Sequence, residues 1–307
     1  MLVVLCHPIF SKRDDSVKFA LGYIVVIGCV LGGYMMHGGY LAALWQPSEF
    51  IIIGGAAAGA FIVANPVHNI KAVGRYIPLM MKGTRFKSDD YLELLGMLYL
   101  VFDKIRRSGM LAIEDDVENP EQSAIFQSFP KILKDHHVMD FISDYLRIMV
   151  LGNMNPHEIE NLMDIELDTH HHESMLPSEA VTTMSDGLPA FGIVAAVMGV
   201  VITMGYISEP PEVLGTKVAA ALVGTFLGVL LAYGFVGPLG QGLKHIADEE
   251  AAYFVCIKTC FIATLQGYGP DLALEYGRKT LPSVVRPSFS QLEESLRERK
   301  AAAKQAG

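Results

Sequence analysis

Charged residues are scarce in this chain. Asp, Glu, Lys and Arg make up 19% of its 307 residues, against about 25% in an ordinary soluble domain. Hydrophobic residues make up 51%, and the mean hydropathy is +0.34. This composition excludes a disordered chain and disfavours a purely soluble protein. The net charge of −9 lacks the basic excess that is typical of nucleic-acid binders, so we expect no nucleic-acid partner.

The sequence also lacks the common signatures of catalysis. It has no phosphate-binding loop, no GxGxxG and no nucleophile elbow. The four cysteines have neither metal-ligand nor disulfide spacing, which predicts reduced structural thiols. Histidines are adjacent at 136–137 and 170–172, but consecutive helical residues point in different directions, which favours a solvated polar face over a metal site. We therefore predict no enzyme, no metal and no cofactor.

Long runs without any charged residue are what the chain does have. Asp, Glu, Lys and Arg are all absent from residues 19–36, 50–67, 188–207 and 218–240. A helix of about 20 apolar residues crosses a hydrocarbon core of about 30 Å. One such run could be the core helix of a soluble protein, but four of them favour an all-α integral membrane protein with four transmembrane helices.

Basic residues predict how the four spans are oriented. The connection at residues 37–49 has no Lys or Arg, and the one at 208–217 has a single Lys. The segment between spans two and three has eleven basic residues, and the tail after span four has nine. Because cytoplasmic flanks are enriched in Lys and Arg, we expect both termini and the long middle segment in the cytoplasm.

This topology divides the chain into five parts. We expect a cytoplasmic lead-in at residues 1–18, spans one and two at 19–67, and a large helical cytoplasmic domain at 68–186. Spans three and four follow at 187–240, and a cytoplasmic helix with a tail at 241–307. The lead-in does not resemble a standard signal peptide, because its short apolar stretch precedes the basic residues rather than following them.

Periodicity predicts several helices outside the membrane. Apolar residues recur at helical spacing in residues 89–107, and Ser108 and Gly109 should end that helix. A second amphipathic run covers 138–149, with Phe141, Tyr145 and Ile148 on one face. Asn155 and Pro156 suit a helix start that leads into an acidic helix at 158–172. Residues 244–265 should extend span four, and 291–304 should form a charged helix or a frayed tail.

Spans three and four contain no acid, base or histidine, but many small residues. Gly224 and Gly228 form a GxxxG pair, and Gly192 and Gly199 lie on a similar smooth face. Small residues allow close helix packing, either within the chain or against a helix of another subunit. Thr225 is the one polar side chain near the middle of span four. Its hydroxyl could serve a functional role, or it could simply bond back to the preceding turn of the helix. If the chain carries ions, spans three and four offer no carboxylate, so a partner would supply it.

Three motifs resemble the MotA family, the larger subunits of bacterial flagellar motor stators. Residues 221–228, ALVGTFLG, with Pro238 ten positions on, resemble the family's last span, and 186–192, DGLPAFG, resemble the start of its third. Residues 106–110, RRSGM, with Glu114 and the later ENP at 118–120, resemble its cytoplasmic domain. The resemblance runs from about residue 21 to about residue 296 and includes the four-span topology.

The resemblance implies a function. Such subunits form a ring, a pentamer in the family, around two helices of MotB, whose aspartate carries the proton. It implies that spans three and four line the ion path, that Thr225 lies beside that aspartate, and that Pro189 and Pro238 shape the helices as it changes protonation. It also implies that Arg106 and Glu114 engage the rotor protein FliG. The chain itself is then expected in the inner membrane of a bacterium.

The resemblance also bears on the coupling ion, and two alternative functions stay open. Sodium-driven relatives carry a threonine in span three where this chain has Ala196, so the resemblance favours protons. An ExbB- or TolQ-like energiser of outer-membrane processes is an alternative, but those relatives usually have three spans. A non-conducting membrane scaffold is the other, and it predicts no ion flux.

Overall fold

The computed structural model describes residues 15–81, 83, 85–152 and 155–306, and these are helical throughout, with no strand among them. They divide into two compact units. The first comprises Met1–Thr84 and Ser174–Ala247, and the second comprises Arg85–Glu173 and Asp248–Gly307. Two long helices contribute to both units. Of the lead-in expected at residues 1–18, residues 1–14 lie outside the described residues, and so does Cys6.

The first unit contains four helices that are long and apolar enough to cross a membrane, as predicted. They lie at Lys18–Met36, at Leu41–Ala64, and within Pro156–Met204 and Pro211–Leu265. The helices of this unit are α1 (Asp15–Met36), α2 (Leu41–Leu44), α3 (Pro47–Ala64), α4 (Val67–Met81), the later part of α10 (Pro156–Met204), α11 (Pro211–Leu231), the π-helical turn η2 (Ala232–Val236) and the start of α12 (Gly237–Leu265).

Local chemistry sets the ends of the second span three residues earlier than the charge-free run suggests. Pro47 takes the first helical position of α3, where its missing N–H costs no hydrogen bond. At the other end Asn65 precedes a proline, which disfavours helical backbone. The Asn65 side chain donates to the carbonyl of Phe61 at 2.8 Å, which satisfies one of the last carbonyls of α3.

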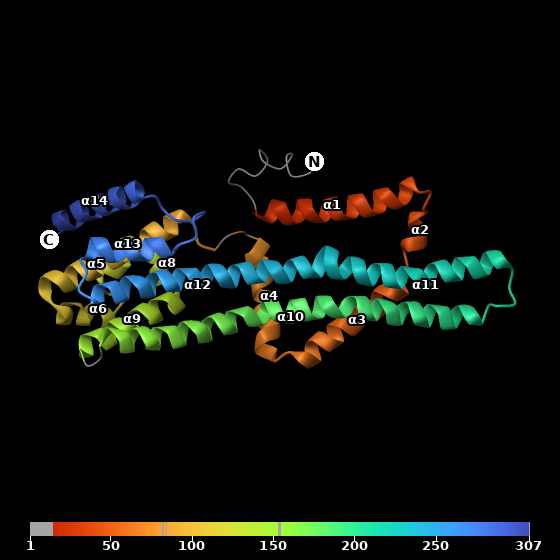
Figure 1. The fold of residues 1–307 in the computed structure, drawn as a ribbon, viewed down its shortest axis with the longest axis horizontal. Coiled ribbons are helices and arrows are strands. Elements are labelled where there is room, and N and C mark those ends of the chain that lie inside the picture. The colour runs from red at the N-terminus through yellow and green to blue at the C-terminus, as the bar shows by residue number, and fades with distance from the viewer. Residues whose placement is uncertain (1–14, 82, 84, 153–154, 307) are drawn as a thin grey trace. The chain divides into compact units, whose positions relative to one another are not determined.

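The second unit is built around a large aromatic and aliphatic core. Its helices are α5 (Ser88–Ser108), η1 (Met110–Ile113), α6 (Glu114–Glu118), α7 (Ala124–Gln127), α8 (Pro130–Leu133), α9 (His136–Leu151), the first part of α10, the later part of α12, α13 (Pro270–Thr280) and α14 (Phe289–Ala306). Phe102, Tyr145 and Phe261 are each at most 1% exposed. Figure 1 shows α5, α13 and α14 close together, and α13 and α14 each contact α5.

The helices predicted outside the spans are confirmed. Gly109 follows α5 with a φ of +83°, a conformation that favours glycine. Asn155 and Glu158 form a reciprocal cap at the start of α10, each side chain accepting from the other's main-chain N–H at 3.0 Å. The acidic helix expected at 158–172 extends much further, because α10 is a single helix that runs through Pro177 and Pro189.

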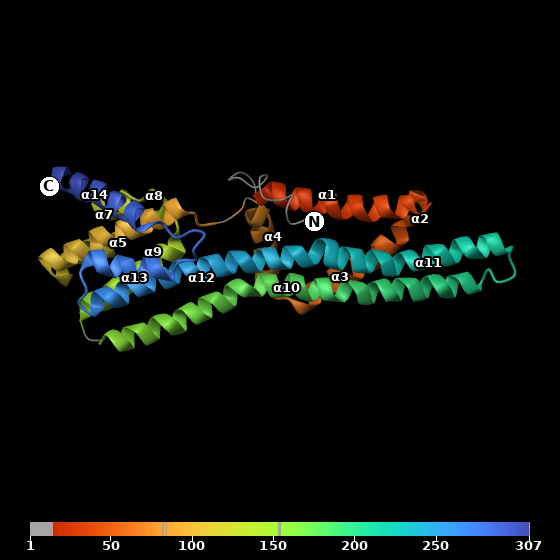
Figure 2. The same cartoon turned by 45° about the horizontal axis from the view of Figure 1, so that its top comes forward.

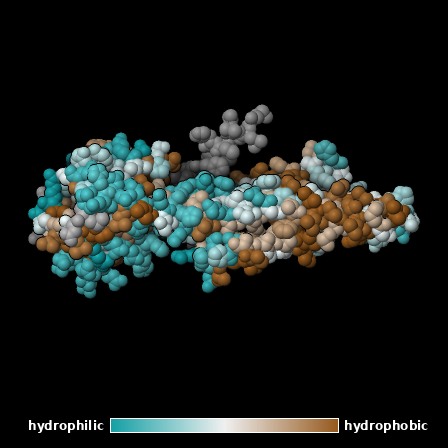
Figure 3. Space-filling model, turned by 60° about the horizontal axis from the view of Figure 1, so that its bottom comes forward, coloured by the Kyte–Doolittle hydropathy of each residue, from teal (hydrophilic) through white to brown (hydrophobic). Residues whose placement is uncertain are grey.

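The two units differ in their surfaces. Large apolar side chains of the spanning helices are exposed, including Ile24 at 65%, Ile62 at 61% and Val201 at 66%. Figure 3 shows the hydrophobic colour gathered over the spanning helices, whereas the second unit is mostly hydrophilic. A soluble monomer rarely exposes so much apolar surface, and a membrane helix does so against lipid or a neighbouring subunit.

Candidate functional site

Glycines bring the third and fourth spans into backbone contact. The spanning part of α10 and α11 run side by side in both Figure 1 and Figure 2. A Cβ added at Gly228 would lie 2.9 Å from the Cα of Gly192, and one added at Gly192 would lie 2.8 Å from the carbonyl oxygen of Gly224. A Cβ at Gly199 would meet Ala221 at 2.7 Å. All four candidate glycines therefore have contacts within this chain, and their packing against a partner helix stays a prediction.

Thr225 is exposed on α11, whereas its neighbour Gly224 is buried. The alternative of a hydroxyl bonded to the preceding turn does not apply to it, because no hydrogen bond from Thr225 occurs among the described residues. By contrast, Thr203 and Thr216 donate to carbonyls one turn earlier, at 2.8 and 2.9 Å. Ala196 is half-buried on α10. Thr225 thus presents an unpartnered hydroxyl on an otherwise apolar surface.

Of the two candidate prolines, Pro238 follows a π-helical turn, and Pro189 lies on the helix whose Ser185 is hydrogen-bonded to that turn. The π-helical η2, Ala232–Val236, lies just before Pro238, whose ring clashes with the carbonyl of residue 234 in a regular helix. Ser185, one turn before Pro189 on α10, donates its hydroxyl to the carbonyl of Ala232 at 2.8 Å. Ser185 is 2% exposed. Pro189 is half-buried and Pro238 exposed, and this hydrogen bond joins the segments that contain them.

A buried carboxyl lies among the spans, contrary to the expectation that only a partner could supply one. Glu49, which we placed in the outer connection, is in the first turn of α3 and only 8% exposed. A Cβ on Gly224 would lie 2.6 Å from Glu49 Oε2, 3.0 Å from the Cβ of Ala195 and 3.1 Å from the main-chain nitrogen of Ala196. Counting charge-free residues placed Glu49 just outside the span. The helix-starting Pro47 was the signal that it belongs inside.

Arg106 and Glu114 lie in the second unit, on two helices that are separated by the short η1. Arg106 is in the last turn of α5, and Glu114 begins α6. Both are exposed, and neither makes an ion pair with another described residue. Their neighbours do: Arg107 pairs with Asp103 at 2.8 Å, and Lys104 with Asp116 at 2.6 Å. Arg106 and Glu114 are therefore charges without an ion-pair partner among the described residues, whereas the adjacent Arg107 and Lys104 are paired.

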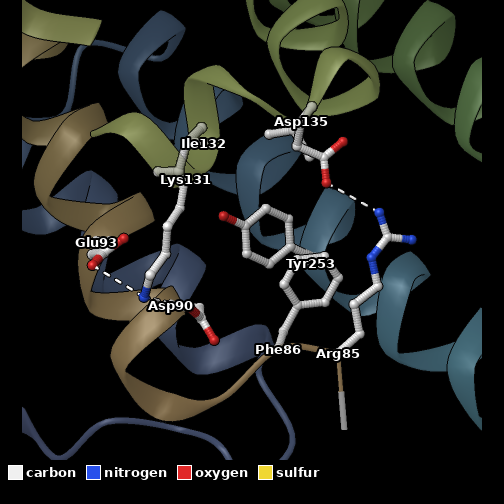
Figure 4. A pocket seen from close by; sticks show the side chains of 9 residues that line it. Arg85, Phe86, Asp90, Glu93, Lys131, Ile132, Asp135 and Tyr253 are labelled. Atoms are coloured by element: carbon white, nitrogen blue, oxygen red, sulfur yellow. Dashed lines mark hydrogen bonds and ion pairs between the residues drawn. The ribbon is translucent and has the colours of Figure 1, made fainter. Parts of the chain in front are cut away.

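A charged pocket in the second unit has its charged side chains in ion pairs. Figure 4 shows Arg85 directed at Asp135 and Lys131 directed at Glu93, around the stacked rings of Phe86 and Tyr253. The Arg85–Asp135 contact is 3.0 Å, and Arg85 also contacts the buried Glu250 at 2.7 Å. Burial raises the pKa of Tyr253 well above its usual value, so the phenol stays neutral. These contacts indicate a structural network rather than a ligand site.

The histidines do not form a metal centre within the described part of the chain. His170 Nε2 lies 3.9 Å from Glu250 and His171 Nε2 lies 3.9 Å from Asp248, so each faces a different carboxylate. The buried thiols of Cys256 and Cys260 are free, and so is the exposed Cys29. Burial of Cys256 and Cys260 agrees with their interpretation as structural thiols, whereas Cys29 is exposed.

Comparison with known proteins places this geometry in a family. The chain is 50% identical over 277 residues to Motility protein A of Salmonella typhimurium, which covers 90% of this chain and 94% of that protein. It is 48% identical over the same length to Motility protein A of Escherichia coli, with the same coverage. The chain belongs to the motility protein A family. Residues 20–109 match the Motility protein A N-terminal family, and residues 133–255 match the MotA/TolQ/ExbB proton channel family.

Solved structures show the same fold as this member of the motility protein A family. The structure of C. jejuni MotAB superposes with a TM-score of 0.71 at 19% identity, covering 89% of this chain and 99% of that chain. The flagellar MotAB stator complex from Bacillus subtilis superposes with a TM-score of 0.67 at 20% identity, covering 90% and 98%. The chain thus combines the sequence of the motility protein A family, the fold of the MotAB structures and four helices able to span a membrane among its described residues.

Proposed function

We propose that this chain is the wall of a proton channel in the flagellar stator, and that a MotB-like partner supplies the proton-carrying acid. Membership of the motility protein A family supports this proposal, as does the fold that the chain shares with the MotAB structures. The observation that carries it is the Thr225 hydroxyl, exposed without a hydrogen-bond partner on an apolar helix. A polar group at such a position needs a polar neighbour inside the membrane.

The proposed topology follows the basic residues. Residues 1–18, 68–186 and 241–307 lie in the cytoplasm, and the connection that precedes α3 and residues 208–217 face outward. Residues 19–67 and 187–240 form the two pairs of spans. The second unit, which contains Arg106 and Glu114, is then on the side of the rotor.

Assembly is proposed to be a pentamer of this chain around two MotB helices. The exposed apolar side chains of the spanning helices leave room for such neighbours, since Leu222 is 63% exposed and Val197 is 55% exposed. Gly192, Gly199, Gly224 and Gly228 bring α10 and α11 together, and the paired helices present Thr225 and Ala196 beside the partner helix. Close packing of small residues is the usual driving force for such contacts in lipid.

Ion coupling then works through a change of charge. A proton moving through 100 mV releases about 2.3 kcal/mol. Protonation of the partner's carboxylate removes a charge beside Thr225, and the helices that contain Pro189 and Pro238 shift between two packings of similar energy. Ala196 offers no oxygen to replace the water around a sodium ion, which favours protons. The ring turns in steps, and Arg106 and Glu114 push against FliG.

A flux measurement tests the channel. Membrane vesicles that contain the chain with its partner should acidify under an imposed proton gradient, and vesicles with the chain alone should not. Thr225→Val should lower the flux without lowering the amount of complex. Thr216→Val is the matched control, because that hydroxyl lies on the same helix and donates to its own preceding turn. Equal flux from the chain alone would contradict the proposal.

A swimming assay tests the rotor contact. Arg106→Glu combined with Glu114→Lys should abolish swimming while proton flux in vesicles stays normal. Arg297→Glu is the control, since Arg297 is an exposed arginine on α14. Reversal of the matching charges on FliG should restore motion. Normal swimming of the double variant would reject the role of these two residues.

A further inference from the structure

Glu49 is a buried carboxyl that the proposed mechanism does not use. It is 8% exposed, and its Oε2 has no hydrogen-bond partner among the described residues. An ionisable side chain inside a membrane segment is costly to keep, and such residues usually serve an ion or substrate pathway. An unpaired buried carboxylate would be strongly disfavoured, so this group is either protonated or shares its charge with something that arrives.

The surroundings of Glu49 offer no counter-charge. Its carboxyl reaches the point where α3 meets Gly224 of α11 and Ala195 of α10. Residues 188–204 of α10 and the short α2, which contacts α11, contain no ionisable group. On α11 the ionisable residues are Glu212 and Lys217, and Lys217 precedes Gly224 by seven positions, about 10 Å along the helix. Lys217 instead lies over the ring of Tyr206, with 4.8 Å from Nζ to the ring centroid.

Two opposing effects make the charge of Glu49 variable. Burial penalises the carboxylate, whereas its position in the first turn of α3, at the positive end of the helix dipole, favours it. The main-chain N–H of Glu49 itself donates to the carbonyl of Gln46 at 3.1 Å. A carboxyl held between such effects can gain and lose a proton as its surroundings change.

The position of Glu49 matches the proposed ion path. It abuts Gly224, the residue directly before Thr225, and the main chain of Ala196 is also at this point. The connection that leads into α3 has no basic residue and is the one we expect outside. A proton taken up at Glu49 would therefore be at the level of Thr225 and on the outer side of α3.

We propose that Glu49 is a second proton-binding group of the channel, taking up a proton from the outer side and passing it toward the partner's acid. In the transfer, hydronium protonates the Glu49 carboxylate and leaves water, and the reverse step delivers the proton onward through water. The ligand is a proton rather than a metal cation. Hard cations take several oxygen ligands, and Gly224, Ala195 and Ala196 bring no side-chain oxygen. This inference rests on the proposed channel function.

The test uses the full chain co-expressed with its partner, in vesicles with an imposed pH gradient. Glu49→Gln keeps the shape and removes the titration, and it should lower proton flux by about tenfold or more. Glu49→Asp, which keeps an acid, should recover part of the flux. The matched control is Glu212→Gln, because Glu212 is an exposed glutamate in the first turn of α11. Unchanged flux in Glu49→Gln, with equal amounts of complex, would overturn the proposal.

Infrared difference spectra between two pH values supply an independent readout. The wild-type complex should show a carboxylic-acid C=O band that disappears at higher pH, and Glu49→Gln should lack that band. A merely structural glutamate would give no such change, and the absence of the band would overturn the inference. If the wild-type pair conducts no protons, the proposed channel function fails, and the infrared band still decides whether Glu49 exchanges a proton.

Discussion

The two units of this protein hold their helices together by different means. In the second unit, large side chains such as Phe102, Tyr145 and Phe261 fill a core, and ion pairs cover it. In the first unit, Gly192 lies against Gly228, and polar contacts link side chains to main-chain carbonyls. Lipid tails are as apolar as leucine, so burial of apolar groups drives helix association less in a membrane than in water. Close backbone approach and a few hydrogen bonds take its place.

The difference matters for mechanism. A core of interlocked aromatic rings resists rearrangement, because removing or shifting one ring leaves a cavity. Smooth glycine faces can move past one another with less loss of contact. The proposed ion-driven movement therefore suits the first unit, and the second unit suits a rigid arm that carries Arg106 and Glu114.

The largest expected effect is in the aromatic core. Phe261→Ala should destabilise the second unit by about 3–5 kcal/mol, because the ring is fully buried and packs edge-on against Phe102 with 5.5 Å between centroids. Thermal denaturation of the purified complex measures this effect. Phe289→Ala is the control, since Phe289 is 62% exposed. A melting temperature equal to that of the control would remove the distinction between the two units.

A smaller effect is expected from one methyl group in the first unit. Gly228→Ala places a Cβ 2.8 Å from the carbonyl oxygen of Leu188, and neither backbone can yield cheaply. The expected cost is about 1–3 kcal/mol, with loss of complex in the membrane. Gly55→Ala is the control, because a Cβ there meets nothing within 4 Å. If both variants assemble equally well, the glycine contact is not what joins α10 and α11.

The ion pairs of the second unit predict a pH dependence. The Arg278 guanidinium hydrogen-bonds Glu275 at 2.6 and 2.7 Å and lowers the pKa of that carboxyl. The stabilisation is complete above the pKa of an unfolded glutamate, about 4.3, and is lost as the pH falls through the lower folded value. Glu275→Gln should cost about 1.5 kcal/mol at neutral pH and flatten this acid dependence.

The effect is measured as the melting temperature of the complex between about pH 3 and about pH 7, a range that includes the pKa of an unfolded glutamate. Glu294→Gln changes an exposed glutamate on α14 and should leave the curve unchanged. An unchanged curve for Glu275→Gln as well would show that the pair with Arg278 adds nothing measurable.

The smallest effect is expected at the hydrogen bond beside the π-helical turn. Ser185→Ala removes the donor to the Ala232 carbonyl and should cost about 0.6 kcal/mol, the usual size of such a bond in a membrane. Because the bond links the segments around Pro189 and Pro238, swimming speed should change measurably even though stability changes little. Thr183→Ala, at an exposed site on the same helix, is the control. Unaltered speed would argue against a role for this bond in coupling.

The sequence by itself determined the number of spans and the main helices outside them. Charge-free runs predicted four membrane helices, and the helical spacing of apolar residues predicted α5 and α9, because both signals are local. Asn155 and Pro156 marked the start of α10 for the same reason. Family motifs then named Thr225, Arg106 and Glu114 as residues to examine.

Only the tertiary structure decided which groups meet. Glu49 is at the edge of a charge-free run, and nothing near it in sequence shows that Gly224 leaves room for its carboxyl. The bond from Ser185 to Ala232 likewise joins two helices whose sequences give no sign of it. Burial and hydrogen bonding depend on residues brought together across spans, and local patterns do not contain that information.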